Sequence, residues 1–399
     1  MTAAADRTGP ALARVWGKEP ALLPAAAPAD PAHLHRTIVA ACEPFRAGTV
    51  FRALPQVRLQ TPFGWLGAPG RLLPDAAESA ADHRARLRRE PPGSGTDAGY
   101  LLSVRQGLHL DAALWSAVRD ALAELWRHVG RPCLPVEAEL TEGDDFTRVR
   151  GLAAPSGHAV LTWVTAGVLE AELHGEDREL RVLRATAGEL LYWPEGTRWR
   201  ERHLDGCLTL RISVPRAQHL ATGAVKDLLA EEVRGRLAYD GTVPHLPWPP
   251  PADRPPGPAA PVSAVGEAIR AAAGGEELAA ALRVRWAAWC SSAGLDPVPE
   301  PRADVPLAPG QRLRVVSDIV RVPDGPGRWI WAVNGHAFPI GGAAGERIAR
   351  QLEPGREPTV GELCRAVGAD QHNGAVTALL RTLHRLRGID LTDGGRTDG

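Results

Sequence analysis

The chain lacks the compositional features that would assign it at once to a class of binding protein. Its 399 residues include 46 Lys or Arg and 47 Asp or Glu, so the formal net charge is only −1. Such a balance gives no overall attraction to nucleic acid or to an anionic membrane. No apolar run reaches the roughly 18 residues that span a membrane, and the first residues lack the pattern of a signal peptide. We therefore expect a cytoplasmic protein that does not enter a membrane, with local binding by a single basic helix as the one route left open to nucleic acid.

Cysteine is scarce and scattered. The chain has five cysteines, an odd number, and they are far apart with no C-x-x-C pair. This pattern excludes a disulfide framework and a zinc knuckle, and it predicts reduced, mostly buried thiols. Lysine occurs only at positions 18 and 226, so nearly every cation is an arginine.

What the sequence does contain is ordinary for a globular protein with a β-rich centre. Apolar residues make up 44% of the chain and charged residues 23%. An amphipathic helix is expected from Leu110 to Val129, between Asp111 and Gly130. From Val136 to Val214, short β-rich runs alternate with Gly, Pro and Asp turns. Their spacing predicts a sandwich or a small barrel.

The second half of the chain reads as helical and then mixed. Helices are predicted at 225–237 and 263–292, with a proline-rich linker at 244–261 between them. Near the C-terminus, Thr359 to Glu362 is a capping box that opens a helix. A second helix and a strand at 389–391 follow, which is the outline of a winged helix. We expect boundaries that divide the chain into 1–215, 216–300 and 301–399.

The most specific motif runs from Gly188 to Trp199. It consists of a glycine turn, an apolar strand and a proline turn, and it ends on a bulky aromatic residue. An indole N–H can donate a hydrogen bond but has no lone pair with which to bind a metal. Trp199 is therefore the position on which the functional reading of the motif depends.

Together with Arg14–Pro20, Val104–His109 and Glu137–Thr141, this motif resembles the bacterial JmjC-type cupin family. That family is the branch of Fe(II)/2-oxoglutarate oxygenases that includes the ribosomal-protein hydroxylases. The resemblance implies an α+β fold, with a double-stranded β-helix (cupin or jelly-roll) as its main domain. It also implies an N-terminal helical layer, a helical dimerisation region and a C-terminal winged-helix-like module, and hence a homodimer.

The resemblance breaks where the family binds iron. In that family an H-x-D/E pair and a later His hold the metal and leave positions for 2-oxoglutarate and dioxygen. The pair falls at Ala154–Ser156 in one register or at Ser156–His158 in the other, and neither supplies two ligands. The later His becomes Trp199. We therefore predict no metal and no cofactor, with Fe(II) and 2-oxoglutarate as the alternative.

The sequence does not identify a catalytic residue, but it offers three candidates: His158, His203 and Glu201. His158 is a surviving ligand, a general acid/base that titrates near neutrality, or a hydrogen-bonded core histidine. His203 and Glu201 share a strand face with Trp199, so a rearranged metal site with His158 is conceivable. The residues expected to line the barrel cavity are Ser156, His158, Trp163, Tyr192, Trp199 and Arg211. Arg211 would anchor a carboxylate or form a salt bridge.

Three function hypotheses stay open at this level. The first is a cupin-like protein that has lost the oxygenase reaction and binds a peptide or protein, in the context of natural-product tailoring. The second is an enzyme, either a peptide hydroxylase with an unusual metal site or a metal-free cupin that uses His158. The third is a DNA-binding regulator that uses the winged helix, whose last helix carries Arg381, His384, Arg385 and Arg387.

Overall fold

The structure is a computed structural model. It describes residues 2–47, 55–66, 69–90, 99–150, 156–175, 179–237, 260–353, 355–368, 370 and 373–392. Most of the predicted proline-rich linker lies outside these residues, and so does Ala154 of the predicted H-x-D position.

The centre of the chain is a ten-stranded antiparallel sheet, which confirms the predicted β-rich region. In the order in which they pair, its strands are β1 (Ala21–Pro24), β9 (Glu189–Trp193), β7 (His158–His174), β10 (Arg198–Pro215), β5 (Glu137–Asp144), β4 (Tyr100–Arg105), β2 (Gln56–Thr61) and β3 (Gly64–Leu66). Two further strands are attached to this path: β6 (Phe146–Arg150) pairs with β10, and β8 (Leu180–Thr186) pairs with β7.

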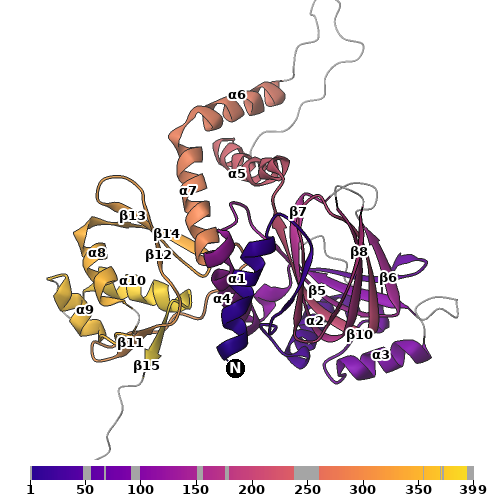
Figure 1. The fold of residues 1–399 in the computed structure, drawn as a ribbon. Helices are drawn as coiled ribbons and strands as arrows, with labels where there is room; N and C mark the ends of the chain where they lie inside the picture. Colours follow the sequence, from indigo (N-terminus) through magenta and orange to yellow (C-terminus); the bar gives the residue numbers. More distant parts are fainter. Residues whose placement is uncertain are drawn as a thin grey trace, which may run out of the picture.

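The two longest strands, β7 and β10, bend in the middle and belong to both halves of the sheet. Their pairing register shifts between Leu204 and Leu208. Asp205 and Gly206 have positive φ values there, and so does Gly167 on β7. Such a bulge kinks a strand and strengthens its twist. The half formed by β6, β8 and the outer parts of β7 and β10 therefore turns back over the other half, and we call the result the barrel (Figure 1).

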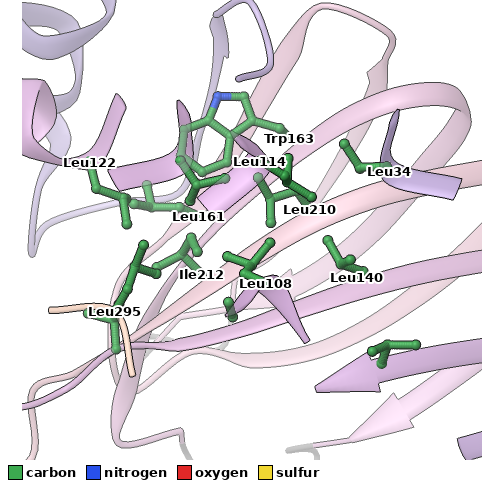
Figure 2. Packing of buried hydrophobic residues seen from close by; sticks show 14 of the residues in the cluster. Leu34, Leu108, Leu114, Leu122, Leu140, Leu161, Trp163, Leu210, Ile212 and Leu295 are labelled. Carbon is green, nitrogen blue, oxygen red and sulfur yellow. The ribbon is translucent and has the colours of Figure 1, made fainter. Parts of the chain in front are cut away.

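One face of the sheet is covered by the N-terminal helices. These are α1 (Thr2–Val15), α2 (Pro31–Arg46), α3 (Ala80–Arg89) and α4 (Ala112–Val129), with the short 3-10 turns η1 (Gly70–Leu72) and η2 (Leu108–Leu110). As predicted, α4 begins at the N-cap Asp111 and ends before Gly130, whose φ is 88°. Leu114 and Leu122 of α4 belong to the same buried core as Trp163 of β7, and Figure 2 shows all three in this core.

The other face of the sheet points into the barrel, where residues of the two halves meet. Val160 and Trp193 come from one half, and Leu169 and Trp199 come from the other. Because side chains alternate between the two faces of a strand, neighbouring residues on β7, β9 and β10 belong to different cores. This alternation decides which predicted residues reach the barrel interior.

The rest of the chain forms a helical region and a mixed C-terminal unit. The helical region holds η3 (Gln218–Leu220), α5 (Ala221–Arg236), α6 (Ala260–Gly274) and α7 (Glu276–Ser291). The C-terminal unit holds β11 (Arg312–Val315), β12 (Val320–Pro323), β13 (Arg328–Val333), β14 (His336–Gly341), α8 (Gly342–Gln351), α9 (Val360–Ala366), α10 (Gly374–Arg385) and β15 (Ile389–Thr392). The helix α7 contacts β12, β13 and β14 (Figure 1).

The C-terminal elements agree with the predicted local pattern. Thr359 and Glu362 form the expected capping box at the start of α9. The next helix starts later than Asp370 suggests, because the side chain of Asn373 caps it. The strand after α10 pairs with β11. The winged-helix assignment and the dimer remain predictions. No helix in the described part of the chain is long and apolar enough to span a membrane.

Candidate functional site

The barrel interior is polar at its centre because charged residues occupy the inward positions of β5 and β10. Leu140 and Leu210 point to the helical layer and are buried there. Glu139 and Arg211, which alternate with them, lie opposite each other in the register of the two strands. On a strand, residues one apart face opposite sides, so this placement follows from the sequence once the strand register is known.

Four charged side chains inside the barrel form one connected network, the barrel ion-pair network: Arg148, Glu139, Arg211 and Glu201. Arg148 donates from both terminal nitrogens to Glu139, at 2.9 and 3.0 Å. Arg211 donates to Glu201 and, at 3.3 Å, to the hydroxyl of Thr162. A terminal nitrogen of Arg211 also lies 3.9 Å from Glu139, which joins the two pairs. Glu201 is 0% exposed and Arg211 is 4% exposed.

Two neighbouring indole rings, with centroids 5.9 Å apart, pack against this network. The guanidinium carbon of Arg211 lies 5.4 Å from the ring centroid of Trp193 and 5.3 Å from that of Trp199. Arg148 lies 5.7 Å from the same Trp199 ring. A cation over an indole face is attracted by the ring quadrupole, more strongly where water is excluded. Trp199 therefore fills part of the barrel and also holds two guanidinium groups in place.

The network sets the protonation of the groups around it. Burial alone would raise the pKa of Glu139, but the charges of Arg148 and Arg211 lower it to about 2. Burial lowers the pKa of His203, and the same two arginines lower it further, to about 3. Neither ring nitrogen of His203 has a hydrogen-bond partner among the described residues. His203 is therefore a neutral imidazole beside two fixed positive charges.

A cavity of about 340 Å³ opens beside the network. Its lining residues are Arg105, Glu137, Glu139, Arg148, Ser156, Gly157, His158, Val160, Trp199, Arg211, Ser213, His219 and Leu220. Ser156, His158, Trp199 and Arg211, which the sequence analysis selects as pocket residues, are thus brought together in one cavity. At its rim, Ser156 accepts a hydrogen bond from the backbone N–H of His158, at 3.2 Å.

The other two predicted pocket residues, Trp163 and Tyr192, face the helical layer instead. Trp163 is 2% exposed and packs in the core beneath α4 (Figure 2). Tyr192 accepts a hydrogen bond from the backbone N–H of Gly17 and stacks on Trp16 at 5.2 Å. The prediction that they line the cavity is wrong. Their neighbours Val164 and Trp193 face the barrel, so Trp163 and Tyr192 face the opposite side of the sheet.

The rearranged site of His158, His203 and Glu201 is also not formed. Glu201 and His203 do share the inward face of β10, as expected. His158, however, pairs with Pro215 at one end of β7, whereas His203 pairs with Leu169 beyond the bend. The two pairing positions on β7, 158 and 169, lie on opposite sides of the bend, so the two imidazoles belong to different halves of the sheet.

Sequence reasoning missed the two central partners, Glu139 and Arg148. A usable signal was present, because Glu137 and Glu139 alternate with apolar residues in a run predicted to be a strand. Charged residues at every second position of a strand indicate a polar inner face. Arg148 could not be selected without the pairing of β6 to β10, which places it opposite Glu201.

A second buried polar cluster, also missed, holds the helical layer on the sheet. The carboxylate of Glu142 lies 2.9 Å from Nδ1 of His35, 2.6 Å from Nδ1 of His83 and 3.0 Å from the hydroxyl of Tyr100. The other ring nitrogens of the two histidines lie against the backbone carbonyls of Glu78 and Leu72. Both ring nitrogens of each histidine therefore face groups that accept hydrogen bonds.

The basic helix proposed for DNA binding is partly occupied by contacts within the chain. Arg381 of α10 pairs with Asp304. His384 is only 9% exposed, and burial lowers its pKa. These two residues are therefore engaged in the C-terminal unit itself.

Comparisons with known proteins give structural matches but no family. No protein-family model matches the chain, and no curated protein matches it either. Solved structures of YcfD, a ribosomal oxygenase from Escherichia coli, do match. One covers 95% of this chain and 96% of its own, at 14% identity and a TM-score of 0.49. A complex with cobalt and succinic acid covers 96% and 98%, at 15% identity and 0.49. A complex with cobalt and 2-oxoglutarate covers 96% and 98%, at 16% identity and 0.46.

These matches agree with the resemblance to ribosomal-oxygenase-like JmjC cupins that the sequence carries. The mixed α/β architecture with its large antiparallel sheet is consistent with that class. One prediction is overturned. The expectation of no cofactor is contradicted, because the matching structures include complexes with cobalt and either succinic acid or 2-oxoglutarate. We do not retain that expectation.

The residues at the barrel centre do not fit a divalent metal. Within the described ranges, no cluster of three or more His, Cys, Asp or Glu could hold such an ion. Glu139 and Glu201 already pair with Arg148 and Arg211, whose charges would repel a dication. The charged groups that face this interior are guanidinium and carboxylate groups paired with one another, and we derive no step through a metal.

Proposed function

We propose that the chain is a peptide- or protein-binding member of the JmjC-like cupin fold class, which binds its ligand at the barrel mouth without hydroxylating it. The observation that carries this proposal is the barrel ion-pair network beneath Trp199. It occupies the barrel centre with two arginines and two glutamates, so the interior is equipped to recognise polar groups. YcfD, whose solved structures match this chain, is a ribosomal oxygenase.

Arg211 is the residue best placed to contact a ligand. Its Nε and one terminal nitrogen are hydrogen-bonded to Thr162 and Glu201. The other terminal nitrogen has only the longer ion contact with Glu139, and the residue lines the cavity. A fixed guanidinium with spare N–H groups donates to carbonyl or carboxylate oxygens. Ser156, His158 and Ser213 add hydroxyl and imidazole groups at the rim.

The proposal keeps the three-part division of the chain and its homodimer. The barrel unit would span 1–215, the helical region 216–300 and the winged-helix-like unit 301–399. Val262, Val265 and Ile269 of α6 are exposed at helical spacing, which supports assembly through the helical region. Sedimentation of the full chain tests this part, and a monomer at micromolar concentration would reject it.

One experiment separates binding from hydroxylation. The full chain is incubated with Fe(II), 2-oxoglutarate and fluorescent peptide pools, and both anisotropy and peptide mass are followed. We expect saturable binding with no change in peptide mass. A gain of one oxygen atom, coupled to succinate release, would instead establish an active hydroxylase. Turnover of any other kind that persists when a chelator is added and is lost in His158→Ala would instead establish a metal-free enzyme.

A further inference from the structure

A second cavity, of about 390 Å³, adjoins the barrel cavity and extends it to the surface. The two cavities share Arg105, Glu139 and Arg148 in their linings, so they lie on either side of the Arg148–Glu139 pair. The residues that line the second cavity are Arg58, Gln60, Thr61, Gly64, Trp65, Ser103, Arg105, Glu139, Phe146, Thr147, Arg148 and Val149. We call the two cavities together the mouth groove.

The mouth groove lies between two edges of the sheet. On one side are β2 and β3, and β3 is the last strand of the pairing path. On the other side is β6, which pairs only with β10 in the described part of the chain and lies at the margin of the barrel (Figure 1). An edge strand presents unpaired backbone N–H and C=O groups, to which an extended peptide can add as a further strand.

The groove carries more positive than negative charge. Its basic lining residues are Arg58, Arg105, Arg148 and Arg211, and its acidic ones are Glu137 and Glu139. Glu201, which pairs with Arg211, adds a third negative charge. Four arginines and three glutamates leave one positive charge in excess. That charge belongs to Arg58, which is exposed and forms no ion pair with any described residue. Its neighbour Leu59 is buried in the helical core, so Arg58 lies on the barrel side of β2.

Apolar side chains stand unburied at the outer end of the groove. Trp65 is 66% exposed and Val149 is 59% exposed, and both line the second cavity. Phe63, at the tip of the same β2–β3 hairpin, is 70% exposed. Trp and Phe are enriched at binding surfaces. Exposing several large apolar side chains side by side is unfavourable in water, and such a patch marks an interaction site.

We propose that the mouth groove binds an extended, acidic peptide segment of a partner protein. The backbone of the segment pairs with the edge of β6, an acidic side chain meets Arg58 and the guanidinium groups beyond it, and an apolar side chain packs on Trp65. This inference rests on the proposed peptide-binding function and specifies its ligand class. Charge complementarity with the groove selects an acidic segment over a basic one.

The test uses the full chain and three fluorescein-labelled dodecapeptide pools. Each pool is randomised except at one central position, which is fixed as Glu, Gln or Lys, and binding is measured by anisotropy. We expect the Glu pool to bind about tenfold more tightly than the Lys pool at low salt, with the difference shrinking as salt is added. Backbone N-methylation of the tightest peptide selected from the Glu pool should weaken it about tenfold, because it removes donors from the strand pairing.

Matched variants locate the site. Arg58→Glu should abolish the preference for Glu and improve binding of the Lys pool, an outcome that a merely unfolded variant cannot give. Trp65→Ala should weaken the Glu pool about tenfold. The controls are Arg198→Glu and Leu180→Ala, both exposed on the outer face of the barrel, and each should leave affinity within about twofold.

The outcomes separate this inference from the function on which it rests. If peptides bind without a charge preference, or if Arg58→Glu and Trp65→Ala leave binding unchanged, the groove assignment is overturned while peptide binding stands. If no pool binds at any salt concentration, the proposed function falls as well. A preference for Glu that Arg58→Glu reverses supports both.

Discussion

The guanidinium carbon of Arg211 lies 5.3 Å from the ring centroid of Trp199. The sequence resemblance predicts a metal-binding histidine at this position, and the chain has Trp199 there. In the structure its indole covers a cation, so an aromatic ring and a guanidinium group stabilise each other inside the barrel.

The Arg211–Glu201 pair should behave as a unit in stability measurements. Arg211→Met leaves the buried carboxylate of Glu201 without its partner, and we expect it to lower the free energy of unfolding by about 3–5 kcal/mol. The double variant Glu201→Met/Arg211→Met should recover much of that loss, since no uncompensated charge remains. Urea unfolding measures both. Arg198→Met, on the outer face of β10, is the control and should change stability by about 0.5 kcal/mol at most.

The single variant Glu201→Met completes the comparison. If the losses of unfolding free energy in Glu201→Met and Arg211→Met sum to the loss in the double variant, this coupling is contradicted. Such a result would mean that Arg211 is stabilised by the indoles of Trp193 and Trp199 alone, and that Glu201 has found another partner.

His203 should make the protein less stable in mild acid. Its pKa is lowered to about 3 in the folded state, from 6.5 in an open chain. Between these values the unfolded chain binds a proton that the folded chain does not, so stability falls as the pH drops below 6.5. The slope from this group is at most about 1.4 kcal/mol per pH unit. Unfolding free energies measured from about pH 6.5 down to about pH 4.5 should show a smaller slope in His203→Leu than in the parent. Equal slopes would reject this assignment.

The buried cluster around Glu142 should make the protein less stable as the pH rises above neutrality. Burial would lower the pKa of His35, but its hydrogen bond to Glu142 and the charge of that carboxylate raise it above 6.5. The stabilisation is complete below pH 6.5 and is lost as the pH rises through the raised pKa of His35. Glu142→Gln should therefore be less stable near pH 6 and should decline less between about pH 6.5 and about pH 9. An unchanged alkaline decline in Glu142→Gln would show that other groups cause it.

The same carboxylate contributes in acid. Burial would raise the pKa of Glu142, but the hydrogen bonds from His35 and His83 lower it to about 2, from 4.5. Its contribution is present above pH 4.5 and is lost as the pH falls toward 2. Glu142→Gln should remove part of this acid loss, which urea midpoints across that range would detect.

The bend of β7 depends on Gly167. A Cβ at this position would lie 2.6 Å from the backbone nitrogen of Cys207, and φ is +66°. Because the obstacle is backbone, it cannot move aside as a flexible side chain would. We expect Gly167→Ala to lower the free energy of unfolding by about 2 kcal/mol or more. Gly175→Ala has no atom within 4 Å of its Cβ and is the matched control. Equal stability of the two variants would mean that the bend tolerates a side chain.

The sequence by itself determined the local structure well. Periodicity and capping residues predict α4 between Asp111 and Gly130, and the capping box from Thr359 to Glu362 marks α9. These signals act within a few residues, through backbone donors and conformational preferences that a local stretch contains in full. The short strands and their turns predicted a sandwich or small barrel, whereas the cupin-like barrel was predicted only through the resemblance of the motif that ends at Trp199 to a known family.

Only the tertiary structure decided which residues share the barrel interior. Trp163 and Tyr192 read as pocket residues, yet the pleat turns them to the helical layer. Glu139 and Arg148 meet because β5 and β6 both pair with β10, at a bend set by Gly167 and Asp205. Strand register joins residues that are distant in the chain, and a shift of one position reverses every side chain. That is why the charged centre of the site could not be read from the order of its residues.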